Sequence, residues 1–249
     1  MPSRRKLAEM LSGVALFFFC CFSFGAFRGL YATYKVNKAN AALKNLKPQT
    51  AITAESGEWH HPLLRENEDY VGWLTVYGTQ ADGPVVQGED NAEYLHTDFY
   101  GNKSKPGTLF MDETVDVNEK DGNRIIYGHM MHDGTMFGSL KKYKDAAFFK
   151  ENNIVRWEDR YGESYYRLFA AVLVSGSAQN TNYMDIQQWA HHLNEEETQE
   201  MLDTLEDRAF IFTKNPTRGE GQYLFLVTCE YSQNAGKLVL VGERIETKR

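Results

Sequence analysis

Cys229 is the residue of this chain best suited to nucleophilic chemistry. It follows a continuous apolar run at 223–228 (YLFLVT), so it lies where a buried strand leaves the core. A thiol needs a neighbour that lowers its pKa or takes its proton, and histidine is the usual one. His129 meets this need, because it ends a second strand-like run at 124–128 and a loop follows it. A lone cysteine is more often a small core residue, but the two residues together predict a Cys–His catalytic pair.

The number of cysteines strengthens this interpretation. The chain has three, and Cys20 and Cys21 lie inside an apolar run near the N-terminus, so Cys229 can form no disulfide within the rest of the chain. An unpaired thiol outside the cytoplasm is open to oxidation, which favours a functional reason for keeping it. Cys20 and Cys21 are better explained as lipid-facing apolar residues, since a thiolate at bilayer depth would be very costly.

The histidines do not form a recognisable metal motif. His129, His132 and Asp133 lie close together, but this spacing lacks the HExxH or cysteine-rich pattern of a metal centre. The adjacent pairs at 60–61 and 191–192 are most simply surface residues. No Gly-rich phosphate loop and no G-x-S-x-G elbow occurs in the sequence. We therefore expect neither a metal nor a cofactor.

Short strand-like runs dominate the part of the chain that must position these residues, and turn signals such as Asp-Gly separate several of them. The nine runs are 72–76, 83–86, 108–111, 124–126, 154–157, 165–174, 210–213, 223–228 and 238–241. Helical patterns are fewer, with 136–142, 145–150 and 195–208 the best candidates. Roughly 190 residues with this spacing predict one mainly-β barrel or sandwich with peripheral helices, beginning near Trp59.

The N-terminal residues predict a membrane anchor. The run at 10–27 carries no charge over 18 residues, roughly 27 Å as a helix, which is close to the thickness of a bilayer core. Basic residues at 4–6 precede it, which by the positive-inside tendency holds the N-terminus in the cytoplasm. A cleaved signal peptide is the alternative, although the run is longer than a usual h-region and no A-x-A-like site follows directly.

The predicted organisation has four parts. They are a cytoplasmic segment at 1–9, a transmembrane anchor at 10–30, a stalk and linker at 31–58, and an extracytoplasmic domain at 59–249. The 42% hydrophobic content suits a folded domain. Residues 48–249 contain 19 basic and 33 acidic residues, a net charge of about −14 that would repel a phosphate backbone. We therefore expect no nucleic-acid partner.

Seven segments of the chain resemble those of class B sortases, in the same order and within 69–245. They are VGWL (71–74), PVVQG (84–88), DNAEYLH (90–96), DFYGN (98–102), IYGH (126–129), DGTMF (133–137) and VTC (227–229). The combination is highly specific, whereas the Thr-Cys pair alone would be weak. The anchor and short stalk are similar too, since sortases of this class are typically held on the outer face of the cytoplasmic membrane in Gram-positive bacteria.

The resemblance implies an eight-stranded sortase β-barrel and a cysteine transpeptidase, with Cys229 as the nucleophile and His129 as the acid/base. In the family the thiolate attacks the carbonyl after Thr in a C-terminal sorting motif, often NPxTx-like for class B. A thioester acyl-enzyme forms, and an amine of the cell-wall peptide or a pilin lysine resolves it. By position match, the residues that would shape the peptide site are Asn91, Leu95, Tyr127 and Glu230.

The sequence departs from the family at the third catalytic member, an arginine whose matching position is Lys237. Arginine presents a planar fork of donors suited to a developing oxyanion, while lysine offers one mobile point charge. Arg244 is the only arginine nearby, but along one regular strand a step of seven would place it on the opposite face. We expect Lys237 to take the role, with Arg244 as the alternative.

Three functions fit these observations. The first is a transpeptidase that joins surface proteins to the cell wall or pilin subunits to one another. The second is a cysteine peptidase that releases the same acyl group to water. The third is a weakly active domain that binds sorting peptides, which Lys237 in place of arginine motivates.

Overall fold

The computed structural model describes most of the chain beyond residue 60. The described residues are Val14, 18–24, Phe27, Tyr31, Tyr34, Lys38, 42–45, 61–213, 221–230 and 236–245, with the backbone alone for Cys229 and Glu230. Contacts divide the chain into two compact units, Met1–Asn45 and Leu46–Arg249. Within the described residues, no helix is long and apolar enough to cross a membrane. Most of the predicted anchor at 10–30, and most of the stalk and linker at 31–58, lies outside them.

All nine predicted strand-like runs form strands. They are β1 (Tyr70–Val76), β2 (Asp82–Val86), β3 (Leu109–Met111), β4 (Arg124–Gly128), β5 (Ile154–Asp159), β6 (Gly162–Ser175), β7 (Ala209–Phe212), β8 (Tyr223–Glu230) and β9 (Gly236–Ile245). The α-helices of the second unit are α2 (Ala146–Glu151) and α3 (Glu195–Arg208), and the 3-10 helices are η1 (Pro62–Arg65), η2 (Glu93–Leu95), η3 (Gly138–Lys144) and η4 (Gln187–Trp189).

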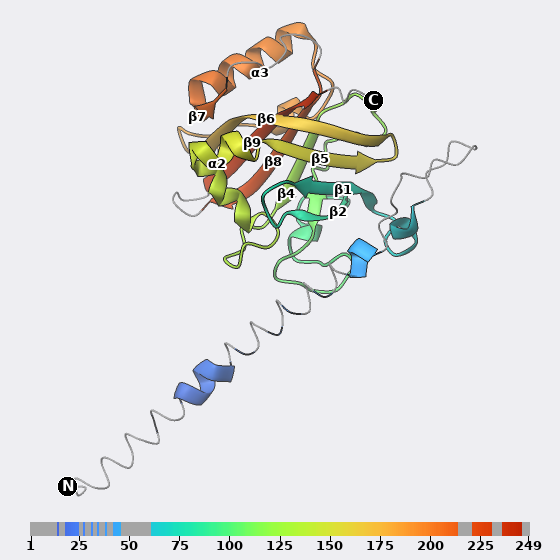
Figure 1. Ribbon diagram of the computed structural model, residues 1–249, viewed down its shortest axis with the longest axis vertical. Helices are drawn as coiled ribbons and strands as arrows, with labels where there is room; N and C mark the ends of the chain where they lie inside the picture. Colours follow the sequence, from blue (N-terminus) through green and yellow to red (C-terminus); the bar gives the residue numbers. More distant parts are fainter. Residues whose placement is uncertain are drawn as a thin grey trace, which may run out of the picture. The chain divides into compact units, whose positions relative to one another are not determined.

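Eight of these strands close into a barrel. The sheet order is β5-β1-β2-β3-β4-β8-β9-β6-β7, and β5 also pairs with β6, which closes the ring (Figure 1). Strand β6 changes partner along one edge, pairing with β5 over 162–167 and with β7 over 170–172. Closure leaves few free strand edges. The predicted eight-stranded barrel is confirmed, with β7 as a ninth strand outside the ring.

The core explains why β8 and β9 are continuous apolar runs. Residues 223–227 of β8 and 238–241 of β9 are at most 1% exposed. On the outside of the barrel, α3 packs against β6 and β7 (Figure 1) through Met201, Leu202 and Leu205, which share one helix face. Trp189 stacks on Phe225 with ring centroids 5.8 Å apart. Because successive residues of a strand point to opposite faces and all of these are buried, β8 and β9 are covered on both faces, which removes the polar alternation of a half-exposed sheet.

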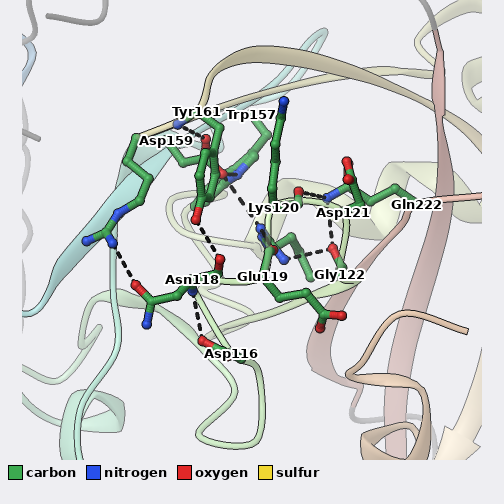
Figure 2. A network of polar contacts seen from close by, with 12 residues as sticks. Asp116, Asn118, Glu119, Lys120, Asp121, Gly122, Trp157, Asp159, Tyr161 and Gln222 are labelled. Atoms are coloured by element: carbon green, nitrogen blue, oxygen red, sulfur yellow. Dashed lines mark hydrogen bonds and ion pairs between the residues drawn. The ribbon is translucent and has the colours of Figure 1, made fainter. Parts of the chain in front are cut away.

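A buried arginine fixes the first residues of β4. Arg124, 1% exposed, donates to the carbonyl oxygens of Glu119 at 2.8 Å and Gly122 at 2.7 Å, and it lies 3.9 Å from Asp159 (Figure 2). The loop at 116–123 is thereby closed onto the start of the strand. Because β4 starts from this clamp, its other end, where His129 follows, has a fixed place in the barrel.

Two local predictions are wrong. The helix expected at 136–142 is the 3-10 helix η3 and begins at Gly138, because Met136 has a φ of 51°, in the left-handed region that a helix cannot include. His61, expected on the surface, is 4% exposed. Its Nδ1 accepts a hydrogen bond from the Leu63 backbone N–H, and its ring lies 4.6 Å from that of Tyr70.

Candidate active site

Three neighbouring strands bring the predicted catalytic residues to one place. Strands β4 and β8 run parallel, and Gly128 pairs with Thr228, so the next residues, His129 and Cys229, lie side by side. Strand β9 runs antiparallel to β8, and there Cys229 pairs directly with Lys237. Adjacent strands are roughly 4.8 Å apart. The register thus places positions 129, 229 and 237 in one row across β4, β8 and β9.

The imidazole of His129 is held by the chain segment around η2. Its Nε2 lies 2.7 Å from the carbonyl oxygen of Leu95, and the ring of His96 stacks on it at 5.7 Å. Because a carbonyl oxygen only accepts, Nε2 carries the proton in this bond, and Nδ1 of the neutral ring is left to accept one. The His129 carbonyl in turn accepts from the backbone N–H groups of Met131 and Phe137. Both the ring and its backbone are therefore fixed.

The ammonium group of Lys237 lies over an aromatic ring on β4. Its Nζ is 5.5 Å from the centroid of the Tyr127 ring, a cation–π distance. Tyr127 is half-buried on β4 and stacks on Phe110 at 5.2 Å. Burial, and then the negative charge of Asp112, raise the pKa of Tyr127 well above its usual range. The phenol is therefore neutral at physiological pH, and it presents an uncharged ring to the ammonium group.

Arg244 lies at the other end of β9. Seven residues along a strand span roughly 23 Å, and Arg244 pairs with Tyr166 on β6. Its guanidinium donates to Oε1 of Gln222 at 2.9 Å and lies 3.7 Å from Asp121. Gln222 in turn donates to the carbonyls of the loop at 120–122 (Figure 2). The structure places Arg244 with the Arg124 clamp and away from His129.

The predicted peptide-site residues are distributed around this row. Leu95 reaches His129 through its carbonyl, and Tyr127 contacts Lys237. The side chain of Asn91 accepts from the backbone N–H of Glu113 at 3.0 Å and donates to Asp112 at 3.1 Å. The backbone of Glu230 pairs with that of Gly236, and its side chain lies outside the described residues, as does that of Cys229.

Asp112 is a buried carboxylate beside Asn91 that the sequence did not single out. It directly follows β3, is 0% exposed, and accepts hydrogen bonds from Asn91, Thr114 and Gln187. The only signal in the sequence was a carboxylate immediately after a short apolar run.

Among the described residues, no group of three or more His, Cys, Asp or Glu side chains lies close enough to hold a metal ion.

A model of a known protein family matches nearly the whole barrel. The model of the sortase domain matches residues 74–245, from the middle of β1 to the end of β9. Sortase B of Staphylococcus aureus is 30% identical over 186 residues, which cover 74% of this chain and 73% of that protein.

Solved structures agree with this assignment. Sortase B of Bacillus anthracis superimposes with a TM-score of 0.73 at 26% identity, and the match covers 88% of this chain and 100% of that protein's chain. A class B sortase of Streptococcus pyogenes involved in pilus biogenesis gives 0.63 at 28% identity over 74% of this chain and 96% of its own. With the family's domain running from β1 to β9, this chain belongs to the sortase family and is a cysteine transpeptidase of the sortase B type.

Proposed function

We propose that this transpeptidase works on the outer face of the cytoplasmic membrane, held there by residues 10–30. Its substrate is an NPxTx-like C-terminal sorting motif of a surface protein, which it cleaves after Thr. The acyl group then passes to an amine of the cell-wall peptide or to a pilin lysine. The observation that carries the proposal is the row of positions 129, 229 and 237 on three neighbouring strands.

In the first half-reaction the Cys229 thiolate attacks the threonine carbonyl, and the negative charge moves to the carbonyl oxygen. The tetrahedral intermediate collapses to a thioester as the C–N bond breaks, and protonated His129 gives the leaving amine its proton. In the second half-reaction neutral His129 takes a proton from the incoming amine, which attacks the thioester. The amide forms, and Cys229 leaves as the thiolate.

The hydrogen bond from His129 to Leu95 supports this assignment of roles. Because Nε2 donates to the Leu95 carbonyl, one nitrogen of the ring is committed to orientation. The proton that moves between substrate and enzyme is then carried by Nδ1. A ring fixed in this way offers the same nitrogen to the leaving amine and to the incoming one, as acid–base catalysis by a single group requires.

Lys237 supplies positive charge beside the reacting carbonyl. Lysine is a more mobile point charge than arginine, but the Tyr127 ring under its Nζ restricts that movement. The contacts of Arg244 with Gln222 and Asp121 support Lys237, rather than Arg244, as the third member of the site.

The anchor part of the proposal rests on the sequence. Residues 10–27 carry no charge, and Arg4, Arg5 and Lys6 precede them. Two acceptor amines are proposed, one of the cell-wall peptide and one of a pilin lysine. The pilin lysine is included because a similar class B sortase of Streptococcus pyogenes is involved in pilus biogenesis.

One experiment tests the reaction, the motif and the acceptor together. The detergent-solubilised full chain is incubated with a library of sorting peptides and a panel of amines, and covalent products are identified by mass spectrometry. We expect a Cys229-linked acyl-enzyme and an amide product that depends on the amine. A hydrolysed peptide with every amine would identify a peptidase instead, and binding without an acyl-enzyme would identify a peptide-binding domain.

A further inference from the structure

Asp112 is a buried carboxylate whose described partners are all neutral. Its Oδ1 accepts from the backbone N–H and the hydroxyl of Thr114 at 2.9 and 2.6 Å. The Gln187 side-chain amide lies 3.2 and 3.1 Å from the two oxygens, and Asn91 donates at 3.1 Å. No basic side chain among the described residues forms an ion pair with it. A charge buried in this way depends on each of these donors.

The donors of Asp112 come from segments far apart in the sequence. Asn91 belongs to the connection between β2 and β3, and Gln187 begins η4 in the connection between β6 and β7. The charge of Asp112 also acts on Tyr127 on β4, where it contributes to the raised pKa of the phenol. Two of the three, Asn91 and Tyr127, occupy positions expected to shape the peptide site. The carboxylate therefore joins three segments that border one site.

The backbone of Asp112 is held from both sides. The Asp112 backbone N–H donates to Ile125 on β4 at 2.9 Å, and its carbonyl oxygen accepts from the side chain of Gln87 at 2.8 Å. Since Asp112 is fixed from both sides, its partners adjust to it rather than the reverse. Gln187 shows this, because it is an exposed residue whose amide nonetheless turns inward to reach the carboxylate.

The charge of Asp112 also bears on the surroundings of Lys237. It contributes to the raised pKa of Tyr127, and the Nζ of Lys237 lies over the Tyr127 ring at 5.5 Å, where nearby negative charge favours the ammonium group. Removal of the charge would weaken the hold of the ring on the ammonium group. Asp112 would thus act on the reaction through Tyr127 and on the peptide through Asn91 and Gln187.

We propose that Asp112 is a positioning residue of the transpeptidation, whose carboxylate fixes Asn91 and η4 beside Tyr127 as one wall of the sorting-peptide site. The proposal rests on the function proposed above, since it concerns the same site. It goes beyond that function by naming the group that organises the wall.

The first test uses two neighbouring glutamines. Gln187→Ala removes a donor to Asp112, whereas Gln188→Ala is the matched control, because Gln188 is equally exposed and donates to the carbonyl of Asp185 at 2.7 Å instead. Both variants are made in the full chain and measured with the cleaved peptide. We expect Gln187→Ala to raise KM roughly 5- to 20-fold with kcat within about threefold. We expect Gln188→Ala to match the wild type.

The second test uses Asp112 itself. Asp112→Asn keeps the shape but presents amide hydrogens to groups that are themselves donors, so we expect kcat/KM to fall on the order of 10²-fold. Tyr127→Phe keeps the ring and removes only the hydroxyl. If Asp112 acts through that hydroxyl, the kcat loss caused by Asp112→Asn is much smaller in the Tyr127→Phe background.

Alkylation of Cys229, located by mass spectrometry so that Cys20 and Cys21 are not counted, measures the active enzyme in each sample. If Asp112 had a purely structural role, Asp112→Asn would reduce the amount of active enzyme and leave KM unchanged. The decrease in kcat caused by Asp112→Asn would then be the same with and without Tyr127→Phe. Equal KM values for Gln187→Ala and Gln188→Ala would overturn the proposal. If Asp112→Asn does not fold, the glutamine pair alone decides.

Different results would refute the proposed function and the positioning role of Asp112. A wild-type chain that forms no Cys229 acyl-enzyme with any sorting peptide refutes that function and the positioning role with it. A wild-type chain that turns over, with both glutamine variants unchanged, refutes only the positioning role.

Discussion

Replacement of Lys237 by alanine removes the positive charge closest in register to the nucleophile. Lys237 and Cys229 are direct cross-strand partners, so the ammonium group can approach a carbonyl oxygen held at the thiol. For an ammonium group about 5 Å from the oxyanion and an effective dielectric constant of about 20, the two unit charges interact by about 3 kcal/mol. That energy corresponds to roughly a 10²-fold change in rate, which agrees with the order of 10²–10³ measured when one oxyanion donor is removed.

This loss should appear in kcat, because the charge on the carbonyl oxygen develops only in the transition state. We expect Lys237→Ala to lower kcat roughly 10²-fold and to leave KM within about threefold, with acyl-enzyme formation followed by rapid-quench mass spectrometry. Lys237→Arg should keep or raise the activity, because it restores the fork of donors found in the family.

Arg244→Ala is the matched control for Lys237→Ala. It removes a positive charge from the same strand, but one that contacts Gln222 and Asp121. We expect its kcat/KM to stay within about threefold of the wild type. An unchanged kcat/KM in Lys237→Ala would refute the reasoning, and so would a loss on the order of 10² in Arg244→Ala.

Three further predictions concern the nucleophile and its base, the anchor and the stability of the barrel. Cys229→Ala should abolish the acyl-enzyme by mass spectrometry with an unchanged circular dichroism spectrum, and His129→Ala should lose roughly 2–4 orders of magnitude in rate; activity near that of the wild type in either variant would contradict its role. The full chain should fractionate with membranes and leave residues 59–249 open to external protease, whereas a mature protein that starts after residue 27 would indicate cleavage. Arg124→Met should lower the free energy of unfolding by about 3 kcal/mol in urea titration, because three buried carbonyl bonds are lost; a change below about 1 kcal/mol would show that the clamp is dispensable.

Much of the fold could be predicted because strands buried on both faces are continuous apolar runs. The segment at 223–228 shows this directly, since it is apolar in the sequence and buried in the structure. The end of β9 could not be predicted from its composition. The run was expected to stop at 241, but residues 242–245 (GERI) continue the strand because β6 pairs with all of them. Pairing with a partner, rather than hydropathy, extends the strand.

The candidate site, like the fold, could be predicted only in part. His129 and Cys229 were expected to act together because each follows an apolar run, and this much is visible in the sequence. Their adjacency depends on β4 and β8 being parallel neighbours one hundred residues apart, which no local pattern specifies. Asp112 was missed for the same reason, because its partners at 91, 127 and 187 meet only in the closed barrel.

The order of strands around the barrel explains why this end of it can hold a reactive thiol. Strand β8 lies in the middle of β4, β8 and β9, so a residue at its end has a neighbouring strand on each side. One side provides His129, which follows the last residue of β4, and the other provides Lys237, directly opposite in register. An edge strand would have offered only one of the two. In register the base and the lysine thus flank Cys229, and the ammonium group of Lys237 extends to the Tyr127 ring on β4.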